Sequence, residues 1–428
     1  MRYTTFVLFL VTAFNLMDRQ ILAILLEPIK RDLQLSDTAM GLLTGFAFVA
    51  LYAVASVPIA RLAETASRRT IIAVALALWS AMTTLSAFAS SFAQLALARI
   101  GIGFAESATG PASNSMIADL YPPARRPFAL SMLATASPVG MMLAFIVGGW
   151  LSDAVGWRMT LVSAGVPGIV LALVVWLTVR EPERGAAESG HADTARYDFR
   201  TTLHHLLRSR AFVYLTLGAA SSVFAIMAMM VWSPSVLTRV HGVATSTAGL
   251  WLGVATGLGG IAGGPLSGWW AGRLSRRDVR WLLRVPSITS MLAAPFLAMF
   301  LLLPPAAALP FFFLAVMCCA AILGPVMAAT QEIAKVRMRA TASALLILSF
   351  NFVGTGLGPV AVGAVSDLLA VTLGNSSIRA ALWLAVAATL LASALFHLGA
   401  RHLREDVAHR RQLTCRCLPS CASGSGGA

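Results

Sequence analysis

Twelve long apolar runs, separated by short polar gaps, restrict most strongly what this chain can fold into. They lie at about residues 3–27, 40–62, 70–89, 93–117, 128–151, 159–179, 211–232, 247–271, 282–303, 308–334, 340–364 and 379–400. A helix that crosses the hydrocarbon core of a bilayer needs about 20 apolar residues. No run alternates with period two, so the pattern argues against a membrane β-barrel. The sequence predicts an all-α integral membrane protein with twelve transmembrane helices.

The composition supports this interpretation. The chain is 58% hydrophobic and 12% charged, whereas soluble domains are about half apolar and about a quarter charged. A net charge of +14 would suggest nucleic-acid binding in a soluble protein. Here the positive side chains occupy the gaps between apolar runs, which indicates a role in membrane topology and no nucleic-acid partner. The first run carries Asp18 and Arg19 and no cleavage site, so it is predicted to be a membrane helix and not a signal peptide.

The basic residues are distributed unevenly between the two sides of the predicted membrane. The odd-numbered gaps hold five of them: Lys30, Arg31, Arg158, Arg239 and Arg379. The even-numbered gaps and the C-terminal tail hold many more. By the positive-inside rule both termini are predicted to be cytoplasmic. Arginine-rich, lysine-poor usage indicates a GC-rich bacterial genome, and the expected location is a bacterial inner membrane.

The longest gap divides the helices into two groups of six. We expect an N-terminal lobe at 1–180, a cytoplasmic linker at 181–210, a C-terminal lobe at 211–402 and a disordered cytoplasmic tail at 403–428. The tail is polar and ends in a Gly/Ser-rich stretch, which is typical of disorder. Two six-helix lobes are the layout of secondary transporters that rock about a central site.

A degenerate repeat links the two halves. The gap after the second run ends in Ser67-Arg68-Arg69, and the gap after the eighth ends in Ser275-Arg276-Arg277. Both gaps resemble the loop signature of the major facilitator superfamily, G-x-L-A-D-R-x-G-R-R. Glu64 takes the acidic position in the first copy, where we expect an ionic latch, and Gly272 takes it in the second, where we do not. The predicted cytoplasmic gate comprises Glu64, Arg68, Arg69, Arg125, Arg273, Arg276 and Arg277.

Further motifs resemble spinster-like transporters, which are related to the anion–cation symporters. These motifs are Asn15-Leu-Met-Asp18-Arg19, the segment from Ala98 to Ser107, and Ala340-Thr-Ala-Ser-Ala344. The resemblance implies a major facilitator fold and transport by alternating access, so we expect a transporter and not an enzyme. It also implies a small-molecule substrate, protons as coupling ions, and a chain that works as a monomer in the lipid bilayer.

Four charges lie where a charge is costly. Asp18 and Arg19 fall near the middle of the first run, and Arg99 and Glu106 lie on one face of the fourth. A charge at mid-bilayer costs about 3 kcal/mol on insertion scales. In the resembled family both helices line the central cavity. We therefore expect Asp18 and Glu106 to couple protons and Arg19 and Arg99 to complete the charge network; a purely structural salt-bridge cluster is the alternative.

The second half offers an apolar cavity wall. Its candidate residues are Phe224, Met227, Trp232, Phe350, Asn351 and Phe352. A cavity that is charged on one side and apolar on the other suits an amphiphilic or lipid-like substrate, with Asn15 and Asn351 as polar contacts. Two alternatives stay open: an organic-anion:proton symporter that binds a carboxylate through Arg19 and Arg99, and a transport-inactive membrane sensor.

Several chemical motifs are missing from the sequence. There is no GxxxxGK[ST] loop for nucleotide, no HExxH metal motif and no GxSxG nucleophile turn. The sequence therefore predicts no cofactor, no metal and no catalytic residues.

Overall fold

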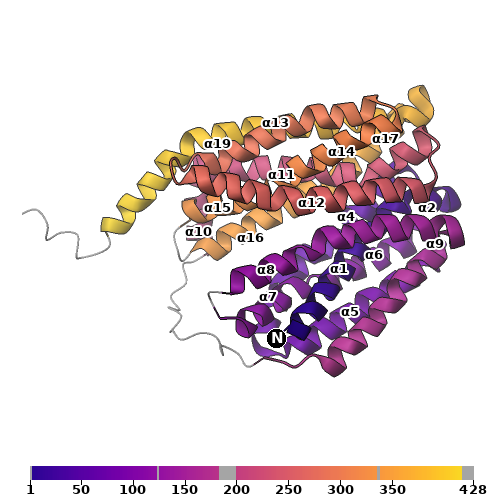
Figure 1. Cartoon of the computed structure of the whole chain (residues 1–428), viewed down its shortest axis with the longest axis horizontal. Helices are drawn as coiled ribbons and strands as arrows, with labels where there is room; N and C mark the ends of the chain where they lie inside the picture. Colours follow the sequence, from indigo (N-terminus) through magenta and orange to yellow (C-terminus); the bar gives the residue numbers. More distant parts are fainter. Residues whose placement is uncertain (1, 123–124, 183–198, 335–337, 417–428) are drawn as a thin grey trace, which may run out of the picture.

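The computed structural model describes residues 2–122, 125–182, 199–334 and 338–416, and these residues form helices and short connections without a strand. Two helical bundles lie side by side (Figure 1): the first half of the chain, indigo to magenta, and the second half, pink to yellow. This arrangement confirms the predicted two-lobe, all-α architecture.

The described part of the first bundle consists of nine helices, several of which are separated by a break of only one or two residues. In chain order they are α1 (Arg2–Ile24), α2 (Leu26–Leu33), α3 (Asp37–Thr44), α4 (Phe46–Thr65), α5 (Arg68–Ser86), α6 (Phe92–Glu106), α7 (Thr109–Leu120), α8 (Arg126–Ala134) and α9 (Ala136–Thr178). Gly156 breaks α9 with a φ of +79°, a conformation that glycine adopts without steric cost. The break turns the chain back, so α9 supplies two membrane spans.

The second bundle repeats this plan. Its elements are α10 (Phe199–Arg208), α11 (Arg210–Ser235), the π-helix η1 (Val236–Val240), α12 (Thr245–Ser275), α13 (Trp281–Leu302), α14 (Pro305–Ala320), α15 (Leu323–Ile333), α16 (Arg339–Ser349), the π-helix η3 (Phe350–Leu357), α17 (Gly358–Leu373), the short 3₁₀ turn η4 (Gly374–Ser376), α18 (Ser377–Ala381) and α19 (Trp383–Arg416).

Eight helical stretches in the described part of the chain are long and apolar enough to cross a membrane. Two of them, Phe128–Thr178 with 51 residues and Thr341–Ala408 with 68, are each long enough for two spans. The glycine-rich α12 and the broken pair α6–α7 supply the remaining spans. The twelve predicted transmembrane helices are thereby accounted for.

Two connecting regions contain helix that the sequence did not predict. The expected linker at 181–210 includes α10, and α19 runs through Arg416 where a disordered tail was expected from residue 403. Because α19 is continuous with the last membrane span, helix propagation carries it into the polar tail. The Gly/Ser-rich end of the tail lies outside the described residues.

Bare glycines bring the two lobes into backbone contact. A Cβ on Gly249 of α12 would lie 2.2 Å from the Phe145 carbonyl oxygen of α9, and one on Gly45 would lie 2.5 Å from the Gly356 oxygen of η3. Small residues allow such close helix approach in membranes. The lobes therefore meet along α9–α12 and α4–η3, and the space between these contacts forms the central site.

Candidate functional site

A polar cavity of about 670 Å³ lies inside the first lobe. Its wall comes from α1, α4, α6, α7 and the α8–α9 region: Thr12, Asn15, Leu16, Arg19, Tyr52, Glu106, Thr109, Gly110, Ser113, Asn114, Leu130, Leu133, Ala134 and Ser137. Helices α6 and α7 break just after Glu106, at Ser107 and Ala108, and this break exposes polar groups of α7 to the cavity.

Glu106 stands unpaired in this cavity. Glu106 is 2% exposed, and in the described part of the chain neither of its carboxylate oxygens has a hydrogen-bond partner of acceptable geometry. The amide of Asn15 lies beside it without completing such a bond. The hydroxyls of Thr109 and Ser113 are also buried and unpaired. Buried polar groups without partners are costly, so the cavity is built to receive a polar group or a proton.

Asp18 faces away from this cavity, towards α5. Its two carboxylate oxygens accept hydrogen bonds from the Thr83 hydroxyl at 2.7 and 2.6 Å. The side chain is 5% exposed. Asp18 thus has a neutral hydrogen-bond donor, which stabilises the charged carboxylate less than an ion pair would.

The two arginines lie against aromatic rings. The Arg19 guanidinium carbon is 4.4 Å from the Phe48 ring centroid and 5.7 Å from that of Tyr52. Arg99 lies 5.9 Å from the Phe48 ring and donates to the Arg19 carbonyl oxygen at 3.2 Å. Within the described residues, none of the four charges forms an ion pair within 4.0 Å. The predicted cluster therefore comes together in space without closing into salt bridges.

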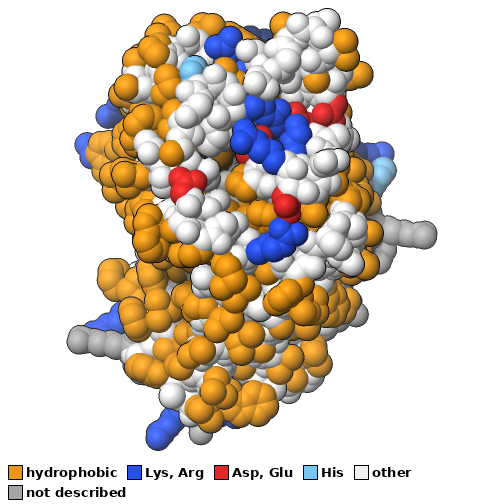
Figure 2. Space-filling model, turned by 90° about the vertical axis from the view of Figure 1, so that its right-hand side faces the viewer, with side chains coloured by type: hydrophobic (Ala, Val, Ile, Leu, Met, Phe, Trp, Pro, Cys, Tyr) orange, Lys and Arg blue, Asp and Glu red, His pale blue; other side chains and the backbone are white. Residues whose placement is uncertain are grey.

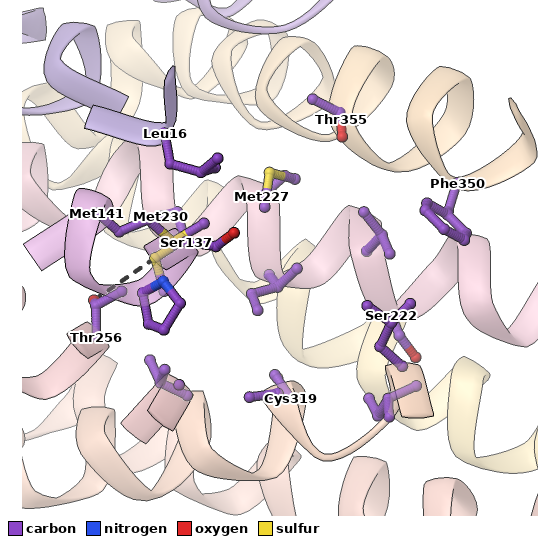
Figure 3. A pocket seen from close by; sticks show the side chains of 18 of the residues that line it. Leu16, Ser137, Met141, Ser222, Met227, Met230, Thr256, Cys319, Phe350 and Thr355 are labelled. Carbon is purple, nitrogen blue, oxygen red and sulfur yellow. Dashed lines mark hydrogen bonds between the residues drawn. The ribbon is translucent and has the colours of Figure 1, made fainter. Parts of the chain in front are cut away.

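A second cavity, of about 370 Å³, lies between the lobes and is mostly apolar. Figure 3 shows Met141, Met227, Met230 and Phe350 around it, with Ser137, Ser222, Thr256 and Thr355 among its polar side chains. Methionine adapts its shape to irregular apolar partners. This wall suits a flexible hydrocarbon group.

The two cavities share Leu16, Arg19 and Ser137. Arg19 also lines a small cavity bounded by α1, α3, α11, η3 and α17. Arg19 therefore stands at the junction of a polar compartment and an apolar one. Sequence reasoning placed Arg19 in the network only by adjacency to Asp18; the helical rotation between neighbours turns Arg19 towards the cavities and Asp18 towards α5.

Half of the apolar wall expected from the sequence lines the inter-lobe cavity. Met227, Phe350 and Asn351 do so. Trp232 instead is fully buried and donates from its indole nitrogen to the Pro359 carbonyl oxygen at 3.0 Å. Phe352 is 46% exposed and packs edge-on to Phe46. The π-helix η3 shifts the side-chain register here, which periodicity alone does not reveal.

The first basic repeat forms a latch, with acids other than the expected one. Arg68 is 1% exposed and pairs with Asp119 of α7 and with Glu181, which follows α9. Glu181 also accepts from the Ser67 hydroxyl at 3.1 Å and the Arg69 backbone N–H at 2.8 Å. Glu64, the acid that the motif suggested, lies in the last turn of α4, and its side chain is outside the described ones.

The remaining predicted gate residues form no ion pair among the described residues. Arg125 is exposed at the start of α8, and Arg273 lies 5.9 Å from the Trp269 ring. Arg276 and Arg277 line a cavity on the surface of the second lobe.

A charged gate that the sequence analysis missed joins the lobes at the opposite end. Arg239 of η1 donates to both oxygens of Asp37 at 2.7 Å and to Glu27 at 3.0 Å. Asp367 of α17 accepts from the Asp37 and Thr38 backbone N–H groups at 3.0 and 2.8 Å. Figure 2 views this end, where acidic and basic side chains gather. The signal in the sequence was Arg239 itself, an isolated cation in an otherwise charge-poor gap.

Comparison with known proteins identifies the family. The Major Facilitator Superfamily profile matches residues 8–359. The chain belongs to the major facilitator superfamily and is of the spinster-like type. It is 35% identical over 404 residues to an MFS-type efflux pump of Mycolicibacterium smegmatis, covering 94% of this chain and 93% of that protein.

Other relatives support the spinster-like assignment. A sphingosine-1-phosphate transporter of Danio rerio is 30% identical over 236 residues, 54% of this chain and 47% of that protein, so the match spans about half of its length. A crystal structure of a bacterial homologue of the human lysosomal transporter Spinster, inward-facing and unoccupied, superposes with a TM-score of 0.85 at 28% identity, covering 95% of this chain and 98% of that one. The chain is therefore a transporter of the major facilitator superfamily.

Proposed function

We propose that this chain is a proton-coupled transporter of an amphiphilic small molecule, working by alternating access in a bacterial inner membrane with both termini cytoplasmic. The observation that carries the proposal is the junction of two cavities at Arg19, one polar with Glu106 and one apolar between the lobes. An amphiphile places its head group in the first and its hydrocarbon part in the second. Relatives named for efflux and for a sphingoid phosphate agree with such a substrate.

Proton coupling is assigned to Glu106 and Asp18. Among the described residues, the buried carboxylate of Glu106 has no donor and that of Asp18 has only the Thr83 hydroxyl, so a proton on either removes the cost of a poorly compensated charge. When Glu106 is neutral, Arg19 and Arg99 lose a nearby negative charge and become available to an anionic head group. Protonation of Glu106 thus favours binding of an anionic head group at the same two arginines.

The closed gate at Arg239 and the apolar contacts α9–α12 define one state of the rocking cycle. Within the described residues, side-chain hydrogen bonds between the lobes occur at this end, as at Arg239–Asp37 and Thr38–Asp367. These contacts support a state in which the cavity is closed at the end with α2; the spinster homologue that superposes on the chain is named as inward-facing. Alternating access requires this gate to open while the opposite end closes.

The test is proton flux in vesicles that contain the purified protein, challenged with lysolipids, sphingoid phosphates and small carboxylates. We expect the amphiphiles to drive proton movement in the wild type and not in Glu106→Gln or Asp18→Asn. Thermal unfolding of the two variants checks that each is still folded. Flux with small carboxylates alone would favour the organic-anion symporter, for which the cavity position of Arg19 is the supporting observation. Unchanged flux in both variants would contradict proton coupling through these acids.

A further inference from the structure

The surface cavity beside the second basic repeat shares no lining residue with the two central cavities. It measures about 430 Å³ and is lined by Ser275, Arg276, Arg277, Asp278, Val279, Arg404, Val407 and Ala408. It lies between the end of α12 and the last part of α19, at the end of the molecule that also carries the first repeat (Figure 1).

The equivalent place in the first lobe is filled by an acid of the chain itself. There Ser67, Arg68 and Arg69 surround Glu181, which follows the last helix of that lobe. In the second lobe the last helix presents Arg404 to Ser275, Arg276 and Arg277 instead. A carboxylate in one lobe is thus replaced by a third arginine in the other.

Among the described residues, no carboxylate lies within ion-pair distance of the three arginines. The side chains of Arg276, Arg277 and Arg404 are all exposed. The acid in this cavity, Asp278, accepts the backbone N–H of Arg280 at 3.0 Å. Three guanidinium groups around one cavity favour an anion, and phosphate oxygens match their donor geometry.

The neighbouring surface indicates where such an anion comes from. Leu258, Ile261 and Trp269 are exposed on α12 and recur at helical spacing towards Arg273 and Arg276. Gly259 and Gly263 of the same helix pack on α14, so this exposed face is turned away from that neighbour. An apolar strip that ends in tryptophan and then arginine is typical of a lipid-facing surface that meets head groups.

We propose that this cavity binds the phosphate of an anionic phospholipid through Arg276, Arg277 and Arg404, with an acyl chain along the exposed face of α12. The lipid supplies the second lobe with the negative charge that Glu181 supplies to the first. Basic pockets at the cytoplasmic side of membrane proteins recognise such head groups by the same chemistry.

The test measures lipid binding by the purified full-length chain in a zwitterionic detergent. Phosphatidylglycerol, phosphatidylcholine and inorganic phosphate are titrated, and native mass spectrometry and thermal unfolding are the readouts. We expect the wild type to retain phosphatidylglycerol in preference to phosphatidylcholine. Each arginine near an anionic head group contributes about fivefold in affinity, so Arg276→Ala/Arg277→Ala lowers the affinity for phosphatidylglycerol about 25-fold.

Two single variants sharpen the result. Arg404→Glu places a carboxylate in the cavity, so it abolishes phosphatidylglycerol retention while the lipid-free melting temperature does not fall. Arg401→Ala, also on α19 but outside the cavity, retains the lipid as the wild type does. Equal retention of both lipids, or retention in the double variant matching Arg401→Ala, would overturn the proposal. Equal stabilisation by millimolar phosphate would overturn the lipid as the ligand.

Discussion

At the scale of single residues, Arg68 shows how a buried cation can organise one end of a membrane lobe. Its guanidinium joins Asp119, Glu181, Ser115 and the Pro182 carbonyl oxygen, so three segments depend on one side chain. The desolvation of such a group is offset only while every partner remains.

We predict that Arg68→Ala lowers the unfolding free energy by about 3 kcal/mol, because it removes the buried cation that pairs with Asp119 and Glu181. Denaturant unfolding of the purified protein measures the change. Arg125→Ala is the matched control: that side chain is exposed and forms no ion pair among the described residues, so the expected change is within about 0.5 kcal/mol. Similar losses in both variants would contradict a specific latch.

Glu181 makes this latch sensitive to acid. Burial raises the pKa of its carboxyl, but hydrogen bonds from the Arg69 backbone and from the Arg68 and Ser67 side chains outweigh that effect and hold the pKa below its ordinary value of 4.5. A group with a depressed folded pKa contributes stability above its unfolded pKa, and the contribution is lost as the pH falls through the folded pKa.

We therefore predict that wild-type stability falls as the pH is lowered below the ordinary glutamate pKa, and that Glu181→Gln flattens this part of the profile. Melting temperatures from neutral pH down to about pH 3 would show it, since the ordinary carboxyl pKa lies inside that range. A variant profile that runs parallel to the wild type would exclude Glu181 as a source of the acid sensitivity.

At the scale of elements, α12 carries glycines with two different roles. Gly249 lies against the α9 backbone, where a Cβ would be 2.2 Å from the Phe145 oxygen, whereas a Cβ on Gly264 would meet nothing within 4 Å. Close helix approach depends on the first glycine and not on the second.

We predict opposite signs for alanine at these two positions. Gly249→Ala pushes α9 and α12 apart and costs about 1–3 kcal/mol of stability, with slower transport. Gly264→Ala reduces backbone freedom without a clash and raises stability by up to about 1 kcal/mol. Thermal unfolding and vesicle transport of the two variants, side by side, measure both effects. Equal destabilisation would show that α12 needs glycine for flexibility instead of contact.

Two π-helical segments also matter at this scale. Segment η1 carries Arg239 into the gate, and η3 carries Phe350 and Asn351 into the inter-lobe cavity. A π-helical turn alters the side-chain register and is often found at functional sites. Both segments therefore place residues that ideal helical periodicity would place elsewhere.

At the scale of the whole molecule, the lobes are held closed at one end by the gate of Arg239, Glu27 and Asp37. The side chains are 9%, 8% and 2% exposed, so the pairs are well shielded from solvent. Removal of one partner leaves the other charge buried and unpaired, which destabilises the closed state by about 3–5 kcal/mol. Such a change is large enough to shift the population of the two rocking states.

We predict that Arg239→Ala opens this end. The readout is maleimide modification of Cys319, which lines the inter-lobe cavity, in a background with Cys415, Cys417 and Cys421 changed to Ser. An impermeant maleimide is applied at the α2 end. It should modify Cys319 at least about tenfold faster in Arg239→Ala than in the same background with Arg239 intact. A tenfold change corresponds to about 1.4 kcal/mol between the closed and open states. The control Arg158→Ala removes a half-exposed pair with Asp32 inside one lobe and should leave the rate unchanged. Equal rates in both variants would contradict the gate.

The sequence by itself determined the membrane class, the twelve spans and the two lobes. Apolar run length and the distribution of basic residues are local properties, so each segment can be assigned without knowing its neighbours in space. Motif resemblance added the family and brought Asp18, Arg19, Arg99 and Glu106 to one region. Tertiary structure alone decided which charges pair. Arg68 pairs with Asp119 and Glu181, and Arg239 pairs with Asp37 and Glu27. Glu106 has no ionic partner among the described residues. Ion pairs form between segments far apart in the chain, and the breaks in α6–α7, η1 and η3 rotate side chains in ways that no local pattern records.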